Sequence, residues 1–127
     1  MRNHICNMVS TISNGQLAKK AFVFQSKKKA CESILNVLWD EGFILGYKNS
    51  PSSSYLYVYL KYKGKLPTIR SLKSVSKPSL RVYYSVKQLW KINSNQGLLI
   101  LSTNRGLLSL SSCKKLKIGG EPVIVVK

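Results

Sequence analysis

Hydrogen-bonding groups of several kinds follow one another near the carboxyl end of the chain. An apolar run, Leu98 to Leu101, ends in Ser102-Thr103-Asn104-Arg105-Gly106, so two hydroxyls, an amide and a guanidinium group stand together. Hydroxyls and amides can bind sugars and base edges, and a guanidinium group can bind phosphate. These residues therefore predict a loop that binds RNA. They are equally typical of a turn between a strand and a helix capped by Ser109, and the two interpretations are compatible.

Residues that usually carry out catalysis are scarce. His4 is the only histidine, and no carboxylate lies near it in the sequence. The acids Glu32, Asp40 and Glu41 lie on or just after a predicted helix, where solvation or pairing with lysine explains them better than acid–base chemistry. The three cysteines are widely spaced without a Cys-x-x-Cys pair, which indicates reduced and mostly buried thiols. We expect no enzyme, no metal site, no cofactor and no small-molecule substrate.

The charge of the chain is strongly unbalanced. Its 127 residues include 21 Lys and Arg but only 4 Asp and Glu, which gives a formal net charge of +17. With 44% hydrophobic residues the chain should still fold around a core, and so much positive charge favours an anionic partner. No apolar stretch approaches the roughly 18 residues of a membrane span, so no membrane partner is expected. Composition alone does not distinguish RNA from DNA.

Two further patterns could contact a nucleic acid or simply form the protein surface. The run Lys27-Lys28-Lys29 is as well explained by a solvated helix face. The alternation of Tyr55, Tyr57 and Tyr59 with apolar residues favours a sheet face over a platform for base stacking. Because three of the four acids lie at the second predicted helix, we expect that helix to face away from the nucleic acid.

Periodicity and turn residues predict an α-β-α-β-β order for the first half, a small sheet with helices on one face. The predicted elements are a helix over Asn3–Asn14 ended by Gly15, a strand over Ala21–Gln25, a helix capped by Ser26 and ended by Gly42, and strands over Phe43–Tyr47 and Tyr55–Tyr62. The basic segment Lys63–Pro67 contains Gly and Pro and is the expected boundary. We therefore predict an amino-terminal α/β domain over residues 1–64.

The second half, residues 65–127, is predicted to be a mostly β domain with a short helix, so the fold class is α+β with two small packed domains. The predicted elements are strands over Ile69–Val75 and Leu80–Ser85 around a turn at Lys77–Ser79, a helical turn over Val86–Ile92, a strand over Gly97–Ser102, a helix over Ser109–Lys117 and a strand over Pro122–Val126.

Several motifs in this order resemble the bacterial-type ribosomal protein S-eight family. The family's carboxy-terminal pattern is a strand, Ser-Thr-Ser-Lys-Gly, a short helix, Gly-Gly-Glu and a closing strand, matched here by Ser102–Gly106 and Gly119-Gly120-Glu121. The segment Val75–Tyr83 resembles its Val-Ser-Lys/Arg-Pro-Gly-Leu-Arg-Ile/Val-Tyr, and Leu60-Lys61-Tyr62 its Leu-Lys-Tyr. Similar matches at 14–16 and 40–44 extend the resemblance over almost the whole chain.

The resemblance implies a non-catalytic protein of the small ribosomal subunit that binds the central domain of small-subunit ribosomal RNA, supports assembly and translation, and touches neighbouring ribosomal proteins. It implies an RNA-binding set drawn from the carboxy-terminal loop, the segment before it and the Gly-Gly-Glu motif. These residues are Ser102, Thr103, Asn104, Arg105, Gly106, Lys77, Arg81, Tyr83, Gly119, Gly120 and Glu121. Glu121 is expected to hold the loop in place rather than to contact phosphate, which would repel it.

The sequence departs from the family pattern at several positions. Asn104 and Arg105 replace serine and lysine, while Ser79, Leu110 and Lys117 replace glycine, aspartate and glycine. Together with the scarcity of acids and the many Lys, Asn and Ser, these changes suggest an organelle-encoded protein, in a mitochondrial ribosome before a plastid one or the bacterial cytoplasm. The alternative function is a small basic DNA-architectural or regulatory module that uses the sheet of the first half.

Overall fold

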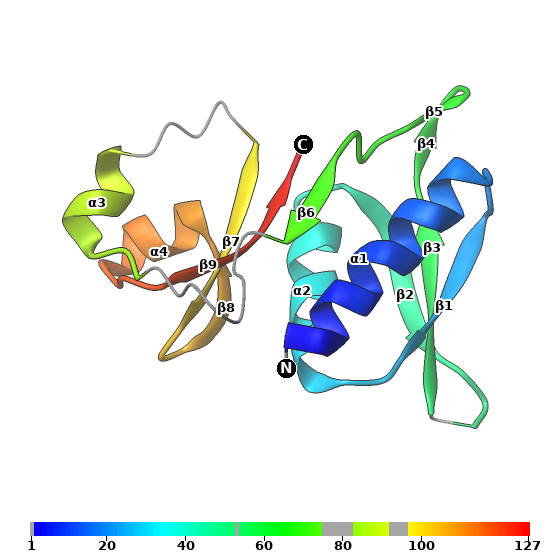
Figure 1. Cartoon of the computed structure of the whole chain (residues 1–127), viewed down its shortest axis with the longest axis horizontal. Helices are drawn as coiled ribbons and strands as arrows, with labels where there is room; N and C mark the ends of the chain where they lie inside the picture. Colours follow the sequence, from blue (N-terminus) through cyan, green and yellow to red (C-terminus); the bar gives the residue numbers. More distant parts are fainter. Residues whose placement is uncertain (1, 53, 75–82, 92–96) are drawn as a thin grey trace. The chain divides into compact units, whose positions relative to one another are not determined.

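The computed structural model describes residues 2–52, 54–74, 83–91 and 97–127. The chain forms two compact units, Met1–Arg70 and Ser71–Lys127. Each unit combines helices with antiparallel sheet (Figure 1), which confirms the predicted α+β class. Among the described residues, no helix is long and apolar enough to cross a membrane.

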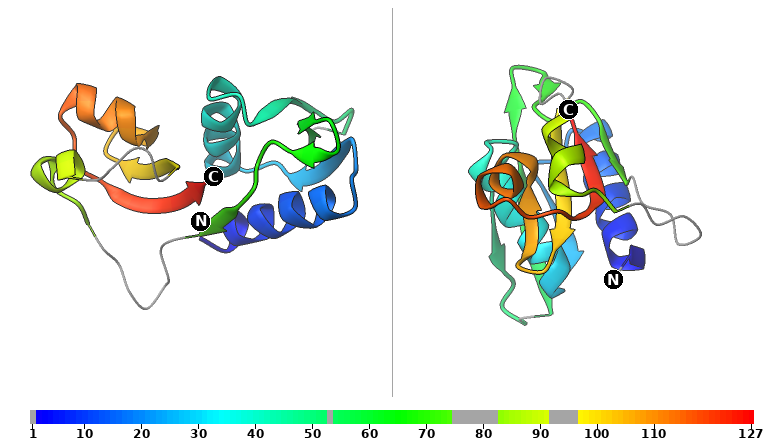
Figure 2. Two further views of the ribbon diagram at one scale, coloured as in Figure 1. Left: turned by 90° about the horizontal axis from the view of Figure 1, so that it is seen from above. Right: turned by 90° about the vertical axis from the view of Figure 1, so that its left-hand side faces the viewer.

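The first unit has the predicted α-β-α-β-β order. Its elements are α1 (Arg2–Leu17), β1 (Phe22–Ser26), α2 (Lys29–Asp40), β2 (Ile44–Asn49) and β3 (Tyr55–Leu60). β3 is the central strand and pairs antiparallel with β1 and β2. α1 packs against β1, α2 packs against β2, and the two helices contact each other (Figures 1 and 2). The helices therefore form one layer and the sheet a second.

The core of the first unit lies between these two layers. Each helix contributes apolar residues spaced three or four apart, and the strands contribute every second residue. The buried set is Ile5, Met8 and Ile12 of α1, Cys31, Ile34, Leu35 and Leu38 of α2, and Val23, Ile44, Leu56, Val58 and Leu60 of the sheet. The opposite face of the sheet carries Phe22, Phe24 and the three tyrosines of β3. The expected alternation along β3 is thereby confirmed.

Gly15 does not end the first helix, contrary to the sequence prediction. α1 continues to Leu17, and Gly15 is buried within it. A Cβ atom at this position would collide with Cγ1 of Val23 on β1 and would come within 3.3 Å of Leu60 Cδ1. The glycine is therefore explained by the close approach of helix to strand rather than by helix termination.

The start of the second helix also differs from the prediction, whereas its end agrees. Ser26 is the last residue of β1, and the residue preceding the helix is Lys28, which has an extended backbone and makes no side-chain cap. At the other end, Gly42 has φ +79° and its N–H donates to the Trp39 carbonyl at 3.0 Å. A glycine just past the helix adopts this left-handed conformation without steric cost.

The segment expected to be a linker is a small hairpin of the first unit. β4 (Tyr62–Lys63) pairs with β5 (Leu66–Pro67), and the Thr68 N–H donates to the Lys61 carbonyl at 3.0 Å. The first compact unit extends to Arg70, and these backbone contacts tie Leu66, Pro67 and Thr68 to it. Gly64, at φ +67°, occupies the turn where we expected a boundary.

The second unit is built around a four-stranded sheet. Its elements are β6 (Leu72–Ser74), α3 (Val86–Lys91), β7 (Leu98–Thr103), β8 (Gly106–Ser109), α4 (Leu110–Leu116) and β9 (Glu121–Val126). The strand order is β6-β9-β7-β8, so the last strand of the chain lies in the interior of the sheet. The predicted strand 69–75 is represented by the shorter β6. The predicted turn at 77–79 and the first half of the predicted strand 80–85 lie outside the described residues.

Helices α3 and α4 pack against each other (Figure 2), and α4 also packs on β7 and β8. They enclose a core of Leu89, Leu101, Leu110 and Cys113, flanked by Tyr84, Leu99 and Leu108. Ser109 caps α4 as predicted, because its hydroxyl accepts from the Ser112 N–H at 3.3 Å. Lys117 ends α4 with φ +56°, the conformation for which the family pattern has glycine.

Candidate RNA-binding surface

The residues Ser102–Gly106 form the end of a β-hairpin rather than a connection between strand and helix. β7 and β8 pair antiparallel from Ile100↔Ser109 to Thr103↔Gly106, which leaves Asn104 and Arg105 as the two residues of the turn. Both turn side chains are exposed. The sequence interpretation missed β8, because the short run Gly106–Ser109 has no alternation of its own that would identify a strand. The turn therefore presents an amide and a guanidinium group to solvent.

The Thr103 hydroxyl holds this turn together. It donates to the Gly106 carbonyl at 2.8 Å and accepts from the Arg105 N–H at 3.1 Å. A threonine that bonds backbone groups two and three residues ahead fixes a turn in the same way as a backbone bond. Thr103 was predicted as an RNA contact. Its place in these two hydrogen bonds assigns the hydroxyl a positioning role within the turn.

Gly106 supplies the backbone conformation that ends the turn. Its φ is +101°, a value that residues with a side chain rarely adopt, whereas Asn104 and Arg105 are not among the described residues with positive φ. Turns with two ordinary central residues followed by a glycine of positive φ are a common hairpin solution. This accounts for a glycine at position 106 independently of any RNA contact.

The Gly-Gly-Glu motif lies beside the hairpin. Glu121 is the cross-strand partner of Ser102 in the pairing of β7 with β9. On the other side, Gly120 and Tyr84 exchange two backbone hydrogen bonds, Tyr84 N–H to Gly120 carbonyl at 2.8 Å and Gly120 N–H to Tyr84 carbonyl at 3.0 Å. The structure thus brings together residues from three separate parts of the sequence. Tyr84 was missed, although it directly follows the predicted Tyr83.

Both glycines of the motif are required by close backbone approach. A Cβ at Gly120 would lie 2.8 Å from the Ser102 carbonyl oxygen and 2.9 Å from Thr103 Cγ2. A Cβ at Gly119 would collide with the Tyr84 carbonyl oxygen and lie 3.3 Å from Cε1 of Tyr83. The ring of Tyr83, 66% exposed, therefore stands next to the motif. Larger residues at 119 or 120 would push the hairpin and the Tyr83 segment away.

Two members of the predicted set cannot be placed beside this surface. Lys77 and Arg81 fall outside the described residues, as does Ser79, which replaces the glycine of the family pattern. The remaining nine predicted residues all lie on the hairpin, on the Gly-Gly-Glu motif or at Tyr83, which abuts the motif. We call these nine, with Tyr84, the hairpin surface.

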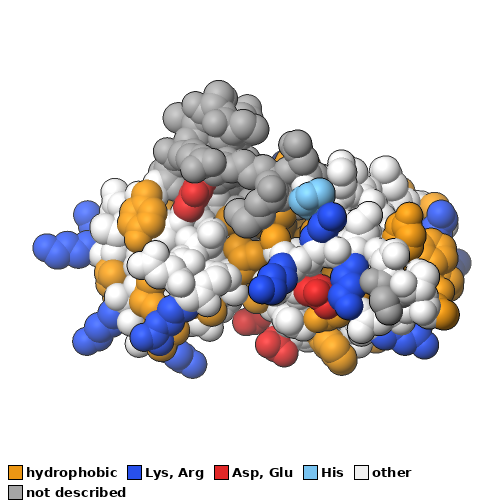
Figure 3. All heavy atoms as spheres, turned by 90° about the horizontal axis from the view of Figure 1, so that it is seen from below, with side chains coloured by type: hydrophobic (Ala, Val, Ile, Leu, Met, Phe, Trp, Pro, Cys, Tyr) orange, Lys and Arg blue, Asp and Glu red, His pale blue; other side chains and the backbone are white. Residues whose placement is uncertain are grey.

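The second unit is also basic around α4. Lys114 places its Nζ 5.4 Å from the centre of the exposed Trp90 ring on α3, a cation–π geometry. No local sequence signal links these residues, because α3 and α4 meet only in the folded unit. The last turn and cap of α4 also carry Lys115 and Lys117, so this helix offers positive charge of the kind that phosphates attract. Figure 3 shows a face that includes both units, where blue Lys and Arg side chains are spread widely with red Asp and Glu side chains among them.

The three cysteines differ in burial and therefore in the chemistry of their thiols. Burial raises the pKa of the Cys31 and Cys113 thiols, because the thiolate loses its hydration. In the described part of the chain, no group of three His, Cys, Asp or Glu residues could hold a metal ion. The two buried cysteines agree with the predicted small hydrophobes, whereas Cys6 is exposed.

A comparison with known protein families identifies the family of this chain. A family model described as "Ribosomal protein S8" matches residues 3–126. The chain belongs to this family. Membership in a family of ribosomal proteins, which are structural, agrees with the expectation that the chain is not an enzyme.

Similar proteins in this ribosomal protein family match over nearly their full length. "Small ribosomal subunit protein uS8" of Alcanivorax borkumensis is 38% identical, over 99% of this chain and 98% of the relative. "Small ribosomal subunit protein uS8c" of Gracilaria tenuistipitata var. liui is 40% identical over 92% of both chains. The protein of Wigglesworthia glossinidia brevipalpis, also named uS8, is 36% identical over 100% of this chain and 98% of the relative. The resemblance drawn from the sequence motifs is thereby confirmed.

Proposed function

We propose that this protein is a structural constituent of the small ribosomal subunit, where it binds the central domain of small-subunit ribosomal RNA and supports assembly and translation. The observation that carries the proposal is the meeting of Ser102, Glu121 and Tyr84 in one surface of a chain from a ribosomal protein family. Neighbouring ribosomal proteins are its expected protein partners.

Within the hairpin surface the residues have different roles. The Ser102 hydroxyl and the Asn104 amide would read sugar hydroxyls and base edges in the shallow groove of an RNA helix, and Arg105 would bind phosphate. Thr103, Gly106, Gly119 and Gly120 would act by holding the backbone in place. Glu121, opposite Ser102 in the sheet, fits the expected role of fixing the hairpin. Lys77 and Arg81 remain predicted contacts from the sequence resemblance.

A binding experiment with two matched double variants tests the proposal. Ser102→Ala with Asn104→Ala should weaken binding of a central-domain RNA fragment by about 1–3 kcal/mol for each specific hydrogen bond to the RNA that is removed. The control, Asn7→Ala with Ser10→Ala, removes the same groups from exposed positions of α1 and should bind like the wild type. Unchanged preference of the first variant for the fragment over a random RNA duplex would overturn the assignment of the hairpin.

The salt dependence of binding gives a second readout. The affinity should fall as salt rises, with a slope that reports the number of phosphates contacted, and Arg105→Gln should reduce that slope by about one phosphate. Competition with duplex DNA addresses the alternative function. If duplex DNA competed better than structured RNA, the regulatory or architectural module would replace the ribosomal proposal.

The mitochondrial ribosome is the proposed location. The support is compositional: few acids, many Lys, Asn and Ser, and departures from the family pattern at positions such as Ser79 and Lys117. The relatives named above come from bacteria and from Gracilaria, so a plastid ribosome or the bacterial cytoplasm are the alternatives. Fractionation of source cells, followed by sedimentation at high salt, should find the protein with mitochondrial small subunits. Recovery with plastid or cytoplasmic ribosomes would instead favour the corresponding alternative.

A further inference from the structure

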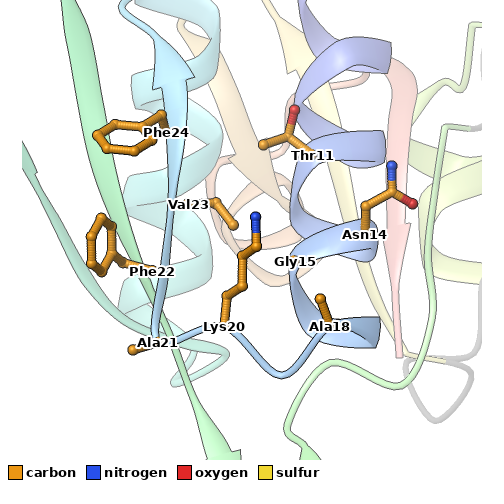
Figure 4. Close-up of a pocket in the computed structure, with 9 residues that line it drawn as sticks. All are labelled: Thr11, Asn14, Gly15, Ala18, Lys20, Ala21, Phe22, Val23 and Phe24. Atoms are coloured by element: carbon orange, nitrogen blue, oxygen red, sulfur yellow. The ribbon is translucent and has the colours of Figure 1, made fainter.

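The first unit carries five aromatic rings on the face of its sheet that is opposite the helices. We call Phe22, Phe24, Tyr55, Tyr57 and Tyr59 the aromatic face. Phe22 pairs with Tyr59, Phe24 with Tyr57, and Ser26 with Tyr55 across β1 and β3, so these side chains share one side of the sheet. Figure 4 shows Phe22 and Phe24 pointing away from α1, whereas Val23 points toward it.

Three of the five rings are strongly exposed for large apolar side chains, whereas Tyr57 and Tyr59 are half-buried. The exposed fractions are 41% for Phe22, 57% for Phe24 and 50% for Tyr55. Exposed aromatic surface costs on the order of 25 cal/mol per Å², and a contiguous patch of this kind marks a binding surface. The sequence favoured an ordinary sheet face for the tyrosines. The two phenylalanines of β1, which complete the cluster, change that interpretation.

The neighbouring rings of the aromatic face pack edge to face or at an incline rather than in parallel stacks. Phe22 meets Phe24 at 82° and Tyr57 at 87°, with ring centres 5.6 and 5.7 Å apart. Phe24 and Tyr57 are inclined at 55° with centres 5.1 Å apart. In such edge-to-face packing the edge of one ring rests on the face of its neighbour, so only the ring faces that remain exposed are open to a ligand. A planar base could therefore stack on one ring while touching the edge of the next.

The positive charge around the aromatic face favours a polyanion as its binding partner. The strands β1, β2 and β3 contain no acidic residue, and Lys48 on β2 places its Nζ 5.6 Å from the centre of the Tyr59 ring. Lys20 and Lys27 flank β1 on either side and are exposed. The acids of this unit lie on α2 or directly after it, and α2 packs against the other face. An acidic or apolar protein surface fits the rings, but only a nucleic acid supplies planar rings and regularly spaced negative charge together.

A hollow of about 620 Å³ with a mostly apolar lining lies at the edge of β1. It lies between α1 and β1, and Phe22 and Phe24 line it together with Thr11, Asn14 and Lys20 (Figure 4). The Thr11 hydroxyl donates to the Asn7 carbonyl within α1, whereas Asn14 and Lys20 place an amide and an ammonium group at this edge of β1. Such groups bind phosphates and sugars without regard to sequence.

We propose that the aromatic face binds a single-stranded RNA segment by stacking unpaired bases on its rings, with the backbone of the strand near Lys20 and Lys48. This is a second RNA contact, separate from the hairpin surface. It depends on the proposed function only in that ribosomal RNA supplies the strand. Recognition is tolerant of sequence, because every base offers a face for stacking.

The test measures binding of the full chain to a labelled oligouridylate of about ten nucleotides, a length within the range that one stacking surface occupies. The double variant Phe24→Leu with Tyr57→Leu keeps apolar volume but removes two ring faces, so binding should weaken at least about tenfold. The matched variant Phe24→Tyr with Tyr57→Phe keeps both rings and should bind like the wild type. An abasic oligomer of equal length should bind the wild type and the leucine variant equally.

Salt dependence separates stacking from charge. The leucine variant should show a lower affinity at every salt concentration with an unchanged slope, whereas Lys20→Gln should reduce the slope by about 0.7, the value for one phosphate of a single strand. Ring-proton shifts in the wild type on addition of oligouridylate give a readout that does not depend on a variant folding. Equal binding by the leucine variant, or absent ring shifts, would overturn the proposal and leave an apolar protein partner as the occupant.

The same two pairs of variants distinguish this proposal from the proposed function. The leucine variant should keep its preference for the central-domain fragment over a random duplex, and the variant lacking Ser102 and Asn104 side chains should keep oligouridylate binding. Both proposals are supported if the variant lacking the Ser102 and Asn104 side chains loses its preference for the central-domain fragment but still binds oligouridylate as the wild type does. If the wild type prefers the central-domain fragment but does not bind oligouridylate, the RNA-binding role of the aromatic face is rejected and the role of the hairpin surface is retained.

Discussion

The hairpin surface and the aromatic face present different chemistry for different structural reasons. The hairpin surface displays polar groups on a turn, and its shape depends on backbone contacts between segments far apart in the sequence, such as Ser102 with Glu121 and Gly120 with Tyr84. The aromatic face displays rings on two paired strands, where alternation alone orients them. The first arrangement suits the reading of one RNA structure, and the second suits any unpaired base. Variants that disturb long-range contacts should therefore affect the hairpin surface most.

The largest effect is expected from Leu101→Ala. Leu101 is fully buried against Leu89, Leu110 and Cys113, directly before the hairpin residues, so truncation removes packing from the core that supports them. The free energy of unfolding should fall by about 2–5 kcal/mol. Urea denaturation measures this, and the exposed Leu116→Ala serves as control with little change. A decrease as small as that of the control would show that the hairpin does not depend on this core.

Gly120→Ala should have the next largest effect. The added Cβ would crowd the Ser102 carbonyl and Thr103, both held in place by strand pairing, so we expect a decrease of about 1–3 kcal/mol in stability and weaker binding of the central-domain fragment. Gly64→Ala is the control, since its Cβ would meet nothing within 4 Å and only its positive φ adds strain. If both variants bound the fragment like the wild type, close approach at Gly120 would not shape the surface.

Thr103→Val should have a smaller effect that is confined to the hairpin. The side chain keeps its shape but can no longer make the two turn hydrogen bonds, at a cost of about 1 kcal/mol, and fragment binding should weaken while oligouridylate binding is unchanged. Ser33→Ala is a control, because its hydroxyl donates to the Lys29 carbonyl at 3.0 Å within α2. Fragment binding reduced equally in both variants would contradict a local role for the Thr103 hydroxyl.

The smallest effect concerns the cysteines. Burial raises the pKa of Cys31 and Cys113, so their thiols stay protonated and unreactive as the pH rises toward the ordinary thiol range, whereas exposed Cys6 should be alkylated first. Mass spectrometry after iodoacetamide treatment of the native protein should find label at Cys6, with the other two labelled only after denaturation. Rapid native labelling of Cys113 would indicate that the core of the second unit opens easily.

Local patterns predicted most of the helices and strands. The alternation along β3, the apolar spacing of α1 and the Ser109 cap of α4 are properties of short segments, so each was predicted correctly from residues close in sequence. The short strands β4, β5 and β8 were missed, because two to four residues are too few to show alternation and their pairing partners lie in other strands. Gly15 was wrongly predicted to end the helix for a related reason. A glycine is needed there because α1 approaches Val23 of β1 closely, and this contact cannot be read from neighbouring residues.

The candidate site was predicted less by geometry than by motif order. The motifs supplied nine of the ten residues of the hairpin surface, but nothing in the sequence predicted that Glu121 would lie opposite Ser102 or that Tyr84 would bond Gly120. The two phenylalanines of β1 were taken only as strand formers. Their membership in the aromatic face depends on the pairing of β1 with β3, which connects strands that are far apart in the sequence.

The amino-acid sequence by itself determined the charge of +17, the α+β class, the family and the chemical groups available for binding. These follow from composition, local periodicity and ordered motifs, all of which are written along the chain. Only the tertiary structure decided which groups share a surface: Ser102 with Glu121 and Tyr84, and Phe22 and Phe24 with the tyrosines of β3. The physical reason is that backbone pairing and close packing join distant segments, and the energy of those contacts exists only once the chain has folded.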